Sequence, residues 1–538
     1  MKWISAIVVS LTLALSVEAQ HSMPHSSGTP VPLESGLSDN HHPVSTSNAE
    51  AQRYFDQGLR YVYAFNHDAA IASFQRATEL DPDLAMGYWG MALALGPNIN
   101  LDVDAGREVR AFDLVRLAAD RAPRASEKER ALIEALGRRY SNNPDADLKA
   151  LNADYSRAMA DVHRRYPDDA DIATLYAESL MNLRPWKFWA ADGTPAEGTN
   201  EIVRVLEGVL ADAPQHLGAN HYYIHAIEAS KNPARATKSA ERLQTLAPAA
   251  GHLVHMPAHI FQRTGQYAAA ARANENGAKA DREFIRKYGQ TGIYPMMYYN
   301  HNLHFGAFSH AAAGNYADAR RLADEVGKNA QAMAKDMADI DPMAATPLLI
   351  ALRFGRWADV LLAPDPAAGP LSTAFWHFGR GVAFAQLGNV SGAEREQKTF
   401  EAARNSFAES SMMMQNSPRK LGEVASHVLA GRIAGARNEW PAAIASYRRA
   451  IEAEDTLNYN EPSDWYYPVR ETLGAVLLRS GDSAGAAQIF REDLDRNPLN
   501  PRSLFGLAQA LGDTPEAAKV RAQYRKSWSG SPLTVRDL

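Results

Sequence analysis

Two pairs of histidines have the spacing of neighbouring ligands on a helix. His221 and His225 are four residues apart, and so are His255 and His259. The second pair follows the first after 34 residues. Residues four apart lie on the same face of an α-helix, one turn above each other. Nine of the 17 histidines fall between residues 216 and 310, so the pairs belong to a local concentration of imidazoles. Since imidazole is the commonest metal ligand in proteins, the pairs indicate a metal site.

The absence of cysteine restricts the chemistry that the sequence can support. Disulfides, thiolate zinc sites, iron–sulfur clusters and a cysteine nucleophile are all excluded. Any metal must therefore be bound by histidine, carboxylate or amide ligands. The chain has 56 lysines and arginines against 62 aspartates and glutamates, a formal net charge of −6. Because this balance offers no basic excess to neutralise phosphates, nucleic acid is not expected as a partner.

The elements that must position the histidines repeat one pattern along the chain. Two helical stretches rich in small residues are joined by a short turn, and Asp-Pro or Ala-Pro often follows the second stretch. Pro214 and Pro248 are 34 residues apart, which is the period of the tetratricopeptide repeat. The pattern is clearest at residues 54–83, 265–281, 314–330, 438–454 and 481–498. The chain resembles the tetratricopeptide repeat (TPR) family over most of residues 49–522, and the resemblance implies an all-α, right-handed TPR-like helical solenoid.

In that family the first helix of each repeat faces a concave groove where ligands bind. The resemblance therefore implies which residues here share that face. Three histidines precede the turn glycine Gly265 by 13, 10 and 6 residues, and two precede Gly314 by 13 and 10 residues. The metal ligands expected on this face are His221, His225, His252, His255, His259, His301 and His304. Glu178 and Glu228 are expected on the same face as catalytic residues, one as a ligand or base and the other orienting an imidazole.

Seven histidines exceed the needs of one ion, so two ions with about three imidazoles each are expected. Ligation by imidazole alone in an oxidising compartment favours copper, which could activate dioxygen to oxidise a phenolic or other small organic substrate. With Glu178 or Glu228 as base, a zinc-bound water would instead support hydrolysis. Two further interpretations stay open. The groove could bind a peptide or small molecule as a non-catalytic or metal-handling scaffold, or the histidines could serve packing alone.

Three insertions interrupt the repeat pattern, at residues 97–104, 184–199 and 282–300. Trp186 and Trp189 lie in the second insertion, and Trp465, Tyr466 and Arg470 lie in another aromatic-rich stretch at residues 461–474. These side chains could form the wall of a pocket over the groove. Filling of the core at repeat junctions is an equally good explanation of them.

The N-terminus has the pattern of a secretory signal peptide. Lys2 precedes an apolar run at residues 4–15, and small residues at positions 17 and 19 suit a cleavage site after Ala19. No later stretch approaches eighteen apolar residues, so no membrane span is expected. The segments HYYIHAIEAS, AGHLVHMPAHIFQRTGQY and YYNHNLHF also resemble a group of exported bacterial TPR proteins. An exported protein, periplasmic or secreted, is therefore predicted.

The predicted organisation has five parts. They are a signal peptide (1–19), a disordered tether rich in His, Ser and Pro (20–48), N-terminal repeats (49–183), central repeats with the histidine cluster (184–330) and C-terminal repeats (331–538). The predicted function is that of an exported solenoid that binds a transition metal and acts as a copper-type oxidoreductase on a small organic substrate. The partner expected in the groove is a small-molecule or peptide ligand.

Overall fold

The computed structural model describes residues 32–290, 292, 294–335, 337–413 and 415–538. In this part of the chain the secondary structure is helical, and the only β-type pairings are three isolated bridges such as that between Asn98 and Leu101. The predicted all-α, TPR-like solenoid is confirmed. No helix among these residues has the length and apolar content needed to cross a membrane.

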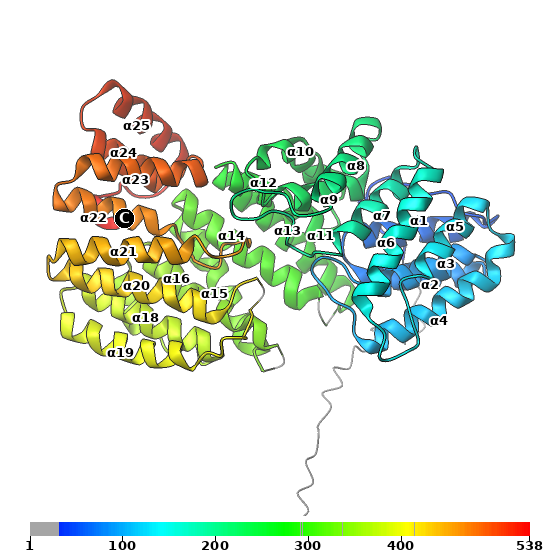
Figure 1. Ribbon diagram of the computed structural model, residues 1–538, viewed down its shortest axis with the longest axis horizontal. Coiled ribbons are helices and arrows are strands. Elements are labelled where there is room, and N and C mark those ends of the chain that lie inside the picture. The colour runs from blue at the N-terminus through cyan, green and yellow to red at the C-terminus, as the bar shows by residue number, and fades with distance from the viewer. Residues whose placement is uncertain (1–31, 291, 293, 336, 414) are drawn as a thin grey trace, which may run out of the picture.

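The helices follow one another as antiparallel neighbours along the chain (Figure 1). The first group comprises α1 (Ala49–Tyr63), α2 (His67–Leu80), α3 (Ala85–Leu95), α4 (Ala105–Arg121), α5 (Glu127–Leu136), α6 (Leu148–Arg165) and α7 (Ala170–Met181). The second comprises α8 (Thr199–Asp212), α9 (Leu217–Ile227), α10 (Thr237–Leu246), α11 (Gly251–His255), α12 (Pro257–Arg263), α13 (Tyr267–Tyr288), α14 (Asn300–Ala313) and α15 (Tyr316–Met333). The third comprises α16 (Thr346–Arg353), α17 (Trp357–Leu362), α18 (Pro370–Gln386), α19 (Val390–Ser406), α20 (Pro418–Ala436), α21 (Trp440–Glu454), α22 (Val469–Ser480), α23 (Ser483–Arg496), α24 (Pro501–Leu511) and α25 (Pro515–Ser527). Single helical turns are found at Ala122–Arg124, Pro233–Ala236, Pro295–Tyr299, Ala338–Ala345 and Val535–Asp537.

Polar caps and glycines determine where paired helices end and begin. The Asn66 side chain accepts a hydrogen bond from the Ala69 N–H at the start of α2, and Asn315 does the same for the Asp318 N–H of α15. Such caps satisfy N–H groups that have no partner within the helix. Gly314 ends α14 with a φ of 90°, a left-handed conformation that side chains disfavour. The Gly-Asn step of the repeat pattern therefore ends one helix and starts the next.

The apolar core has two large parts. One extends from Leu37 to Phe305 and includes α9, α11 and α12, so the N-terminal and central repeats pack together across position 183. The other extends from Ala345 to Leu538. The histidine-bearing helices belong to the first core, and the C-terminal repeats approach them from one side (Figure 1).

The first part of the insertion predicted at 282–300, residues 282–288, lengthens a helix. Helix α13 continues through them to Tyr288, and Gly289 ends it with a φ of 60°. The physical reason is that this stretch has neither proline nor glycine before Gly289, so nothing in it stops a helix that is already formed. The insertions at 97–104 and 184–199 do lie between helices.

The disordered tether predicted at 20–48 is wrong for its described part, residues 32–48. His42 is buried, and its Nδ1 lies 2.9 Å from Oδ2 of Asp171 on α7. The same carboxylate accepts hydrogen bonds from the Tyr63 hydroxyl and from Nε2 of His216. A buried carboxylate needs several donors, and the segment supplies two of them, His42 and Asn40, which fixes it to the helices. Residues 20–31 and the predicted signal peptide, 1–19, lie outside the described residues.

Candidate metal centre

Four helices of the central repeats position the histidines. Helix α9 carries His221 and His225, and its N-terminus is capped by Nδ1 of His216, which accepts from the Ala219 N–H at 3.1 Å. Helices α11 and α12 follow one another with Met256 between them, and Pro257 at the start of α12 lacks the N–H that would continue the hydrogen bonding of a single helix. Helix α14 supplies the remaining imidazoles.

Six of the seven predicted ligands form two groups of three. In the first triad, one nitrogen from each of His221, His225 and His252 lies within 4.8 Å of the others. In the second triad, His255, His259 and His301 meet the same limit. Five of the six side chains are almost fully buried, and His301 is partly buried. Each triad therefore has the number and type of donors of a three-imidazole metal site.

Within each triad, two ring nitrogens lie at the distance of a hydrogen bond. Nε2 of His221 is 3.1 Å from Nε2 of His252, and Nε2 of His255 is 3.1 Å from Nε2 of His259. In each pair one ring donates an N–H to the lone pair of the other, and a metal ion bound there would take the place of that proton. The pairs therefore mark the positions where a proton and a metal would compete.

The opposite ring nitrogens bind acceptors, which sets the tautomers. Nδ1 of His221 lies 2.7 Å from the Tyr63 carbonyl oxygen, and Nδ1 of His255 lies 2.9 Å from the Asn274 side-chain oxygen. The Asn274 amide is itself oriented, because its nitrogen donates to the Ala270 carbonyl at 3.1 Å. A carbonyl can only accept, so both Nδ1 atoms carry the proton and both Nε2 atoms present a lone pair to the triads. Partners of this kind orient metal-ligating histidines.

Glu228 joins the two triads. One carboxylate oxygen is 2.7 Å from Nδ1 of His225, and the other contacts Nδ1 of His259. Burial by itself would raise the pKa of the Glu228 carboxyl. The positive charges of His259 and His225 and their hydrogen bonds outweigh burial and hold this pKa well below its usual range. Glu228 therefore stays ionised and orients one imidazole of each triad.

The imidazoles themselves are mostly neutral. Burial, followed by repulsion from neighbouring imidazoles, lowers the pKa of His221, His252, His255 and His301 well below 6.5. His259 is different, because attraction to Glu228 outweighs the effect of burial and raises its pKa. Neutral imidazole is the form that binds a metal, so burial prepares most of these ligands for it.

Two of the predicted site residues lie outside the triads. The His304 ring packs edge-on against Phe308 with 4.9 Å between ring centroids, and burial lowers its pKa to about 4. Glu178 lies on α7, where it accepts a hydrogen bond from Asn182 close to the charge of Arg139. Among the described residues no hydrogen bond, ion pair or ring contact joins either side chain to a triad imidazole. A shared helix position therefore does not bring these two to the centre.

Aromatic rings cover the triads, so they form a buried centre instead of the open groove that was predicted. Phe65, from the turn after α1, packs on three imidazoles of the first triad, with 4.6 Å to His221. Trp186 of the second insertion lies 5.4 Å from His225, and Tyr298 lies 4.7 Å from His252. The physical reason is that inserted segments and a distant turn fill the concave face. The role of Phe65 has no signal in the local sequence.

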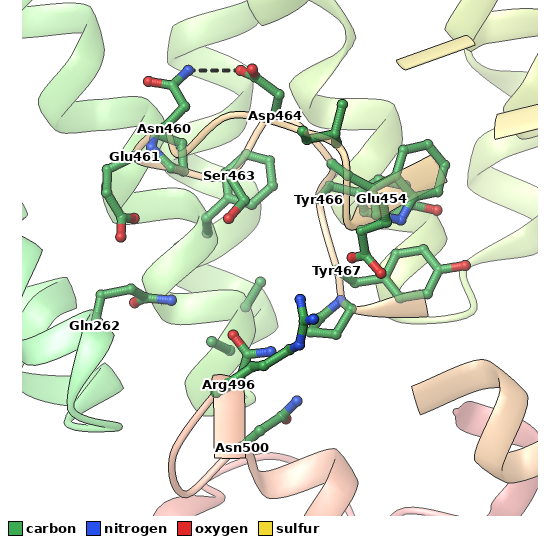
Figure 2. Close-up of a pocket in the computed structure, with 18 of the residues that line it drawn as sticks. Gln262, Glu454, Asn460, Glu461, Ser463, Asp464, Tyr466, Tyr467, Arg496 and Asn500 are labelled. Atoms are coloured by element: carbon green, nitrogen blue, oxygen red, sulfur yellow. Dashed lines mark hydrogen bonds between the residues drawn. The ribbon is translucent and has the colours of Figure 1, made fainter. Parts of the chain in front are cut away.

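A cleft of about 250 Å³ lies beside the centre, between α12, α14 and the segment that joins α21 to α22 (Figure 2). Trp465 and Tyr466, two of the aromatic residues predicted to wall a pocket, line it. Arg470 instead pairs with Asp455. Tyr459 connects the cleft to the centre, since its hydroxyl lies 3.3 Å from a Glu228 oxygen and 2.8 Å from an oxygen of Glu461.

A third group of possible ligands, His42, Asp169 and Asp171, does not resemble the triads. Asp171 already accepts four hydrogen bonds from side chains, and Asp169 pairs with Lys128. These carboxylates have their partners within the protein, so the group serves to hold residues 32–48 in place.

Fold and site together define a TPR-like helical repeat protein with two buried histidine triads. Comparison with protein-family models and with curated proteins gave no match. Among solved structures, the chain is similar to Cut9–Hcn1 of the APC/C, at 13% identity and a TM-score of 0.33 over 89% of this chain and 79% of that one. It is also similar to the human IFIT1 dimer with m7Gppp-AAAA, at 13% identity and a TM-score of 0.33 over 89% and 90% of the two chains. Yeast Tom70 gives 13% identity and a TM-score of 0.25 over 89% and 92%. Scores this low say nothing about ligand or reaction.

Proposed function

We propose that each triad binds one transition-metal ion and that the protein is a metalloenzyme whose metal is copper. The observation that supports this most is the pair of 3.1 Å contacts between Nε2 atoms, His221 with His252 and His255 with His259. Nε2 of His221 and Nε2 of His255 present lone pairs there, and a metal ion would replace the proton that each pair of nitrogens shares. Cysteine-free ligation by three imidazoles per ion suits copper, zinc, iron and nickel.

The position of Glu228 favours oxidation over hydrolysis. A zinc hydrolase needs a base beside the metal-bound water. Both oxygens of Glu228 face Nδ1 atoms, on the sides of the His225 and His259 rings away from the other ligands, and Glu178 is outside the centre. We therefore assign Glu228 a positioning role and propose an oxidoreductase acting on a small organic substrate. Copper, when bound, would supply one-electron redox chemistry and a site for dioxygen. Export, as expected from residues 1–19, is part of this proposal.

The test is metal content per chain after purification and after reconstitution with copper or zinc. We expect about two ions in the native sequence, about one in His221→Ala and in His255→Ala, and none in the double variant. His304→Ala is the matched control, because it removes a partly buried imidazole outside both triads. Circular dichroism must show the same helical content in all variants. Full metal content in the double variant would refute the site, and bound copper without oxygen uptake on any phenolic substrate would point to metal handling.

A further inference from the structure

The cleft beside the centre is lined by carboxyl groups and aromatic rings. The carboxylates are Glu454, Glu461, Asp464 and Glu471. Figure 2 shows the carboxyl groups of Glu461 and Glu454 pointing into the space of the cleft, toward the side that Gln262 and Arg496 occupy. Tyr267, Phe308, Tyr459, Trp465, Tyr466 and Tyr467 provide the rings. The cleft therefore combines negative charge with flat apolar walls.

The arginines of the cleft already have partners. Arg353 forms a two-pronged ion pair with Glu471, and Arg496 binds both oxygens of Asp455. Arg263 donates to two main-chain carbonyls, those of residues 228 and 230. These cations are thus held by other groups and do not neutralise Glu461.

Glu461 is the carboxylate without a counter-ion. Its side chain is buried, it accepts one hydrogen bond from Tyr459, and it forms no ion pair with any described residue. Burial raises the pKa of its carboxyl to about 7, and the charges of His259 and Arg263 offset only part of this effect. Burial also raises the pKa of the nearby Glu454, to about 8, although this carboxyl lies 4.0 Å from Arg470 and accepts from the Val469 N–H. An uncompensated buried carboxyl gains most from a cation that enters beside it.

A second, independent feature also indicates a ligand. Trp465 is 2% exposed and lines the cleft, yet its indole Nε1–H has no hydrogen-bond partner among the described residues. A buried donor of this kind normally has an acceptor. Tyrosine and tryptophan faces also attract organic cations. The missing partners are thus a cation for Glu461 and an acceptor, such as a hydroxyl oxygen, for Trp465.

We propose that the cleft binds a small arylalkylamine, with its ammonium group paired to Glu461 and its ring between the aromatic walls. The proposal rests on the proposed function in one respect, because it names the substrate class of the same centre. Tyr459 supplies the connection, since its hydroxyl contacts both Glu461 and Glu228. A ligand on Glu461 therefore sits one side chain, that of Tyr459, away from the carboxylate that orients both triads.

The test compares three probes that share a phenol ring and differ in charge. They are tyramine, 4-ethylphenol and 3-(4-hydroxyphenyl)propionate, titrated calorimetrically into the full chain with and without copper. We expect tyramine to bind at least about tenfold more tightly than 4-ethylphenol, a difference of roughly 1.4 kcal/mol, and the propionate to bind most weakly. Glu461→Gln should remove the preference for tyramine. Glu409→Gln, at a site with an 85% exposed side chain, should leave it unchanged.

The comparison of the three probes with the native sequence tests the proposal even if the Glu461→Gln variant does not fold. Equal binding of tyramine and 4-ethylphenol would overturn the proposal, and so would an unchanged preference in a folded Glu461→Gln. The result also separates the two proposals. Selective binding of tyramine by a chain that takes up no metal would refute the proposed function alone. Stoichiometric copper binding without a preference for tyramine would refute only the proposal that the cleft binds an amine.

Discussion

Glu228 is the residue on which both triads depend for orientation, because it faces an imidazole of each one. Glu228→Gln keeps the shape of the side chain and replaces one acceptor oxygen by a donor. One of the two Nδ1–H groups then faces an N–H group and loses its acceptor. We expect copper affinity to fall about 10–100-fold, as is typical when a partner of a ligating histidine is removed. Competition with a chelator of known copper affinity measures this loss of affinity.

Glu178→Gln is the matched control for that prediction. Glu178 is also a buried glutamate on a helix of the repeat, but it contacts Asn182 and lies near Arg139 instead of an imidazole. Its substitution should change thermal stability and leave copper affinity within about twofold. Equal losses of copper in the two variants would show that buried charge in general, and not orientation of the ligands, controls the centre.

The sequence predicted which imidazoles gather, because the 34-residue offset and the i,i+4 spacing are local signals. The sequence could not predict which imidazoles combine to form each triad. His304 has the same offset from its turn glycine as His255, yet its ring faces Phe308. Phe65 and Tyr459 reach the centre from positions more than 150 residues away in sequence from His221 and His259, and no periodicity marks them.

At the scale of elements, α13 passes α11 so closely that only glycine fits between them. A Cβ on Gly277 would lie 2.7 Å from the His255 Cβ and 2.9 Å from the Gly251 carbonyl oxygen. Gly277→Ala should therefore push the two helices apart, at a cost of about 1–3 kcal/mol in stability. It should also weaken copper binding in the second triad, which contains His255. Thermal unfolding and metal content per chain measure the two effects.

Gly208→Ala is the control on α8, where a Cβ would meet no atom within 4 Å. Alanine favours a helix over glycine by up to about 1 kcal/mol, so this variant should be as stable as the native sequence or more so. Equal stability of Gly277→Ala and Gly208→Ala would mean that the approach of α13 to α11 is not tight. The repeat pattern predicted these helices well, but it could not predict how closely they pass, since that depends on side chains of both.

At the scale of the whole molecule, the solenoid closes its own concave face. Residues 32–48 pack on α7 and α9 through His42 and Asp171, and the segment between α21 and α22 reaches Glu228 through Tyr459. Repeat periodicity describes contacts between neighbours in sequence. The two closing segments make contacts across the molecule, which is why an open groove was predicted and a buried centre is found.

Burial of so many ionisable groups makes stability depend on pH in both directions. The pKa is lowered for His67, His221, His225, His252, His255, His301 and His304. It is raised to about 7 for Asp281 and Glu461, about 8 for Glu454 and about 6 for Asp493. Burial is the largest cause in every case. More groups have a lowered pKa than a raised one. Where both kinds of group affect stability, the effect of the histidines is therefore the larger.

We therefore expect the metal-free protein to be most stable near pH 6.5. Below that pH the unfolded chain binds protons on histidines that stay neutral when folded, so stability rises with pH. The raised carboxyls act oppositely, because the folded chain keeps protons that the unfolded chain releases above about pH 4. Above pH 6.5 the effect of the histidines fades as the unfolded imidazoles lose their protons, while the raised carboxyls still act, so stability should fall toward pH 8. Thermal unfolding between pH 5 and 8 tests this, with Glu454→Gln expected to flatten the alkaline fall. Stability rising steadily to pH 8 would contradict the expectation.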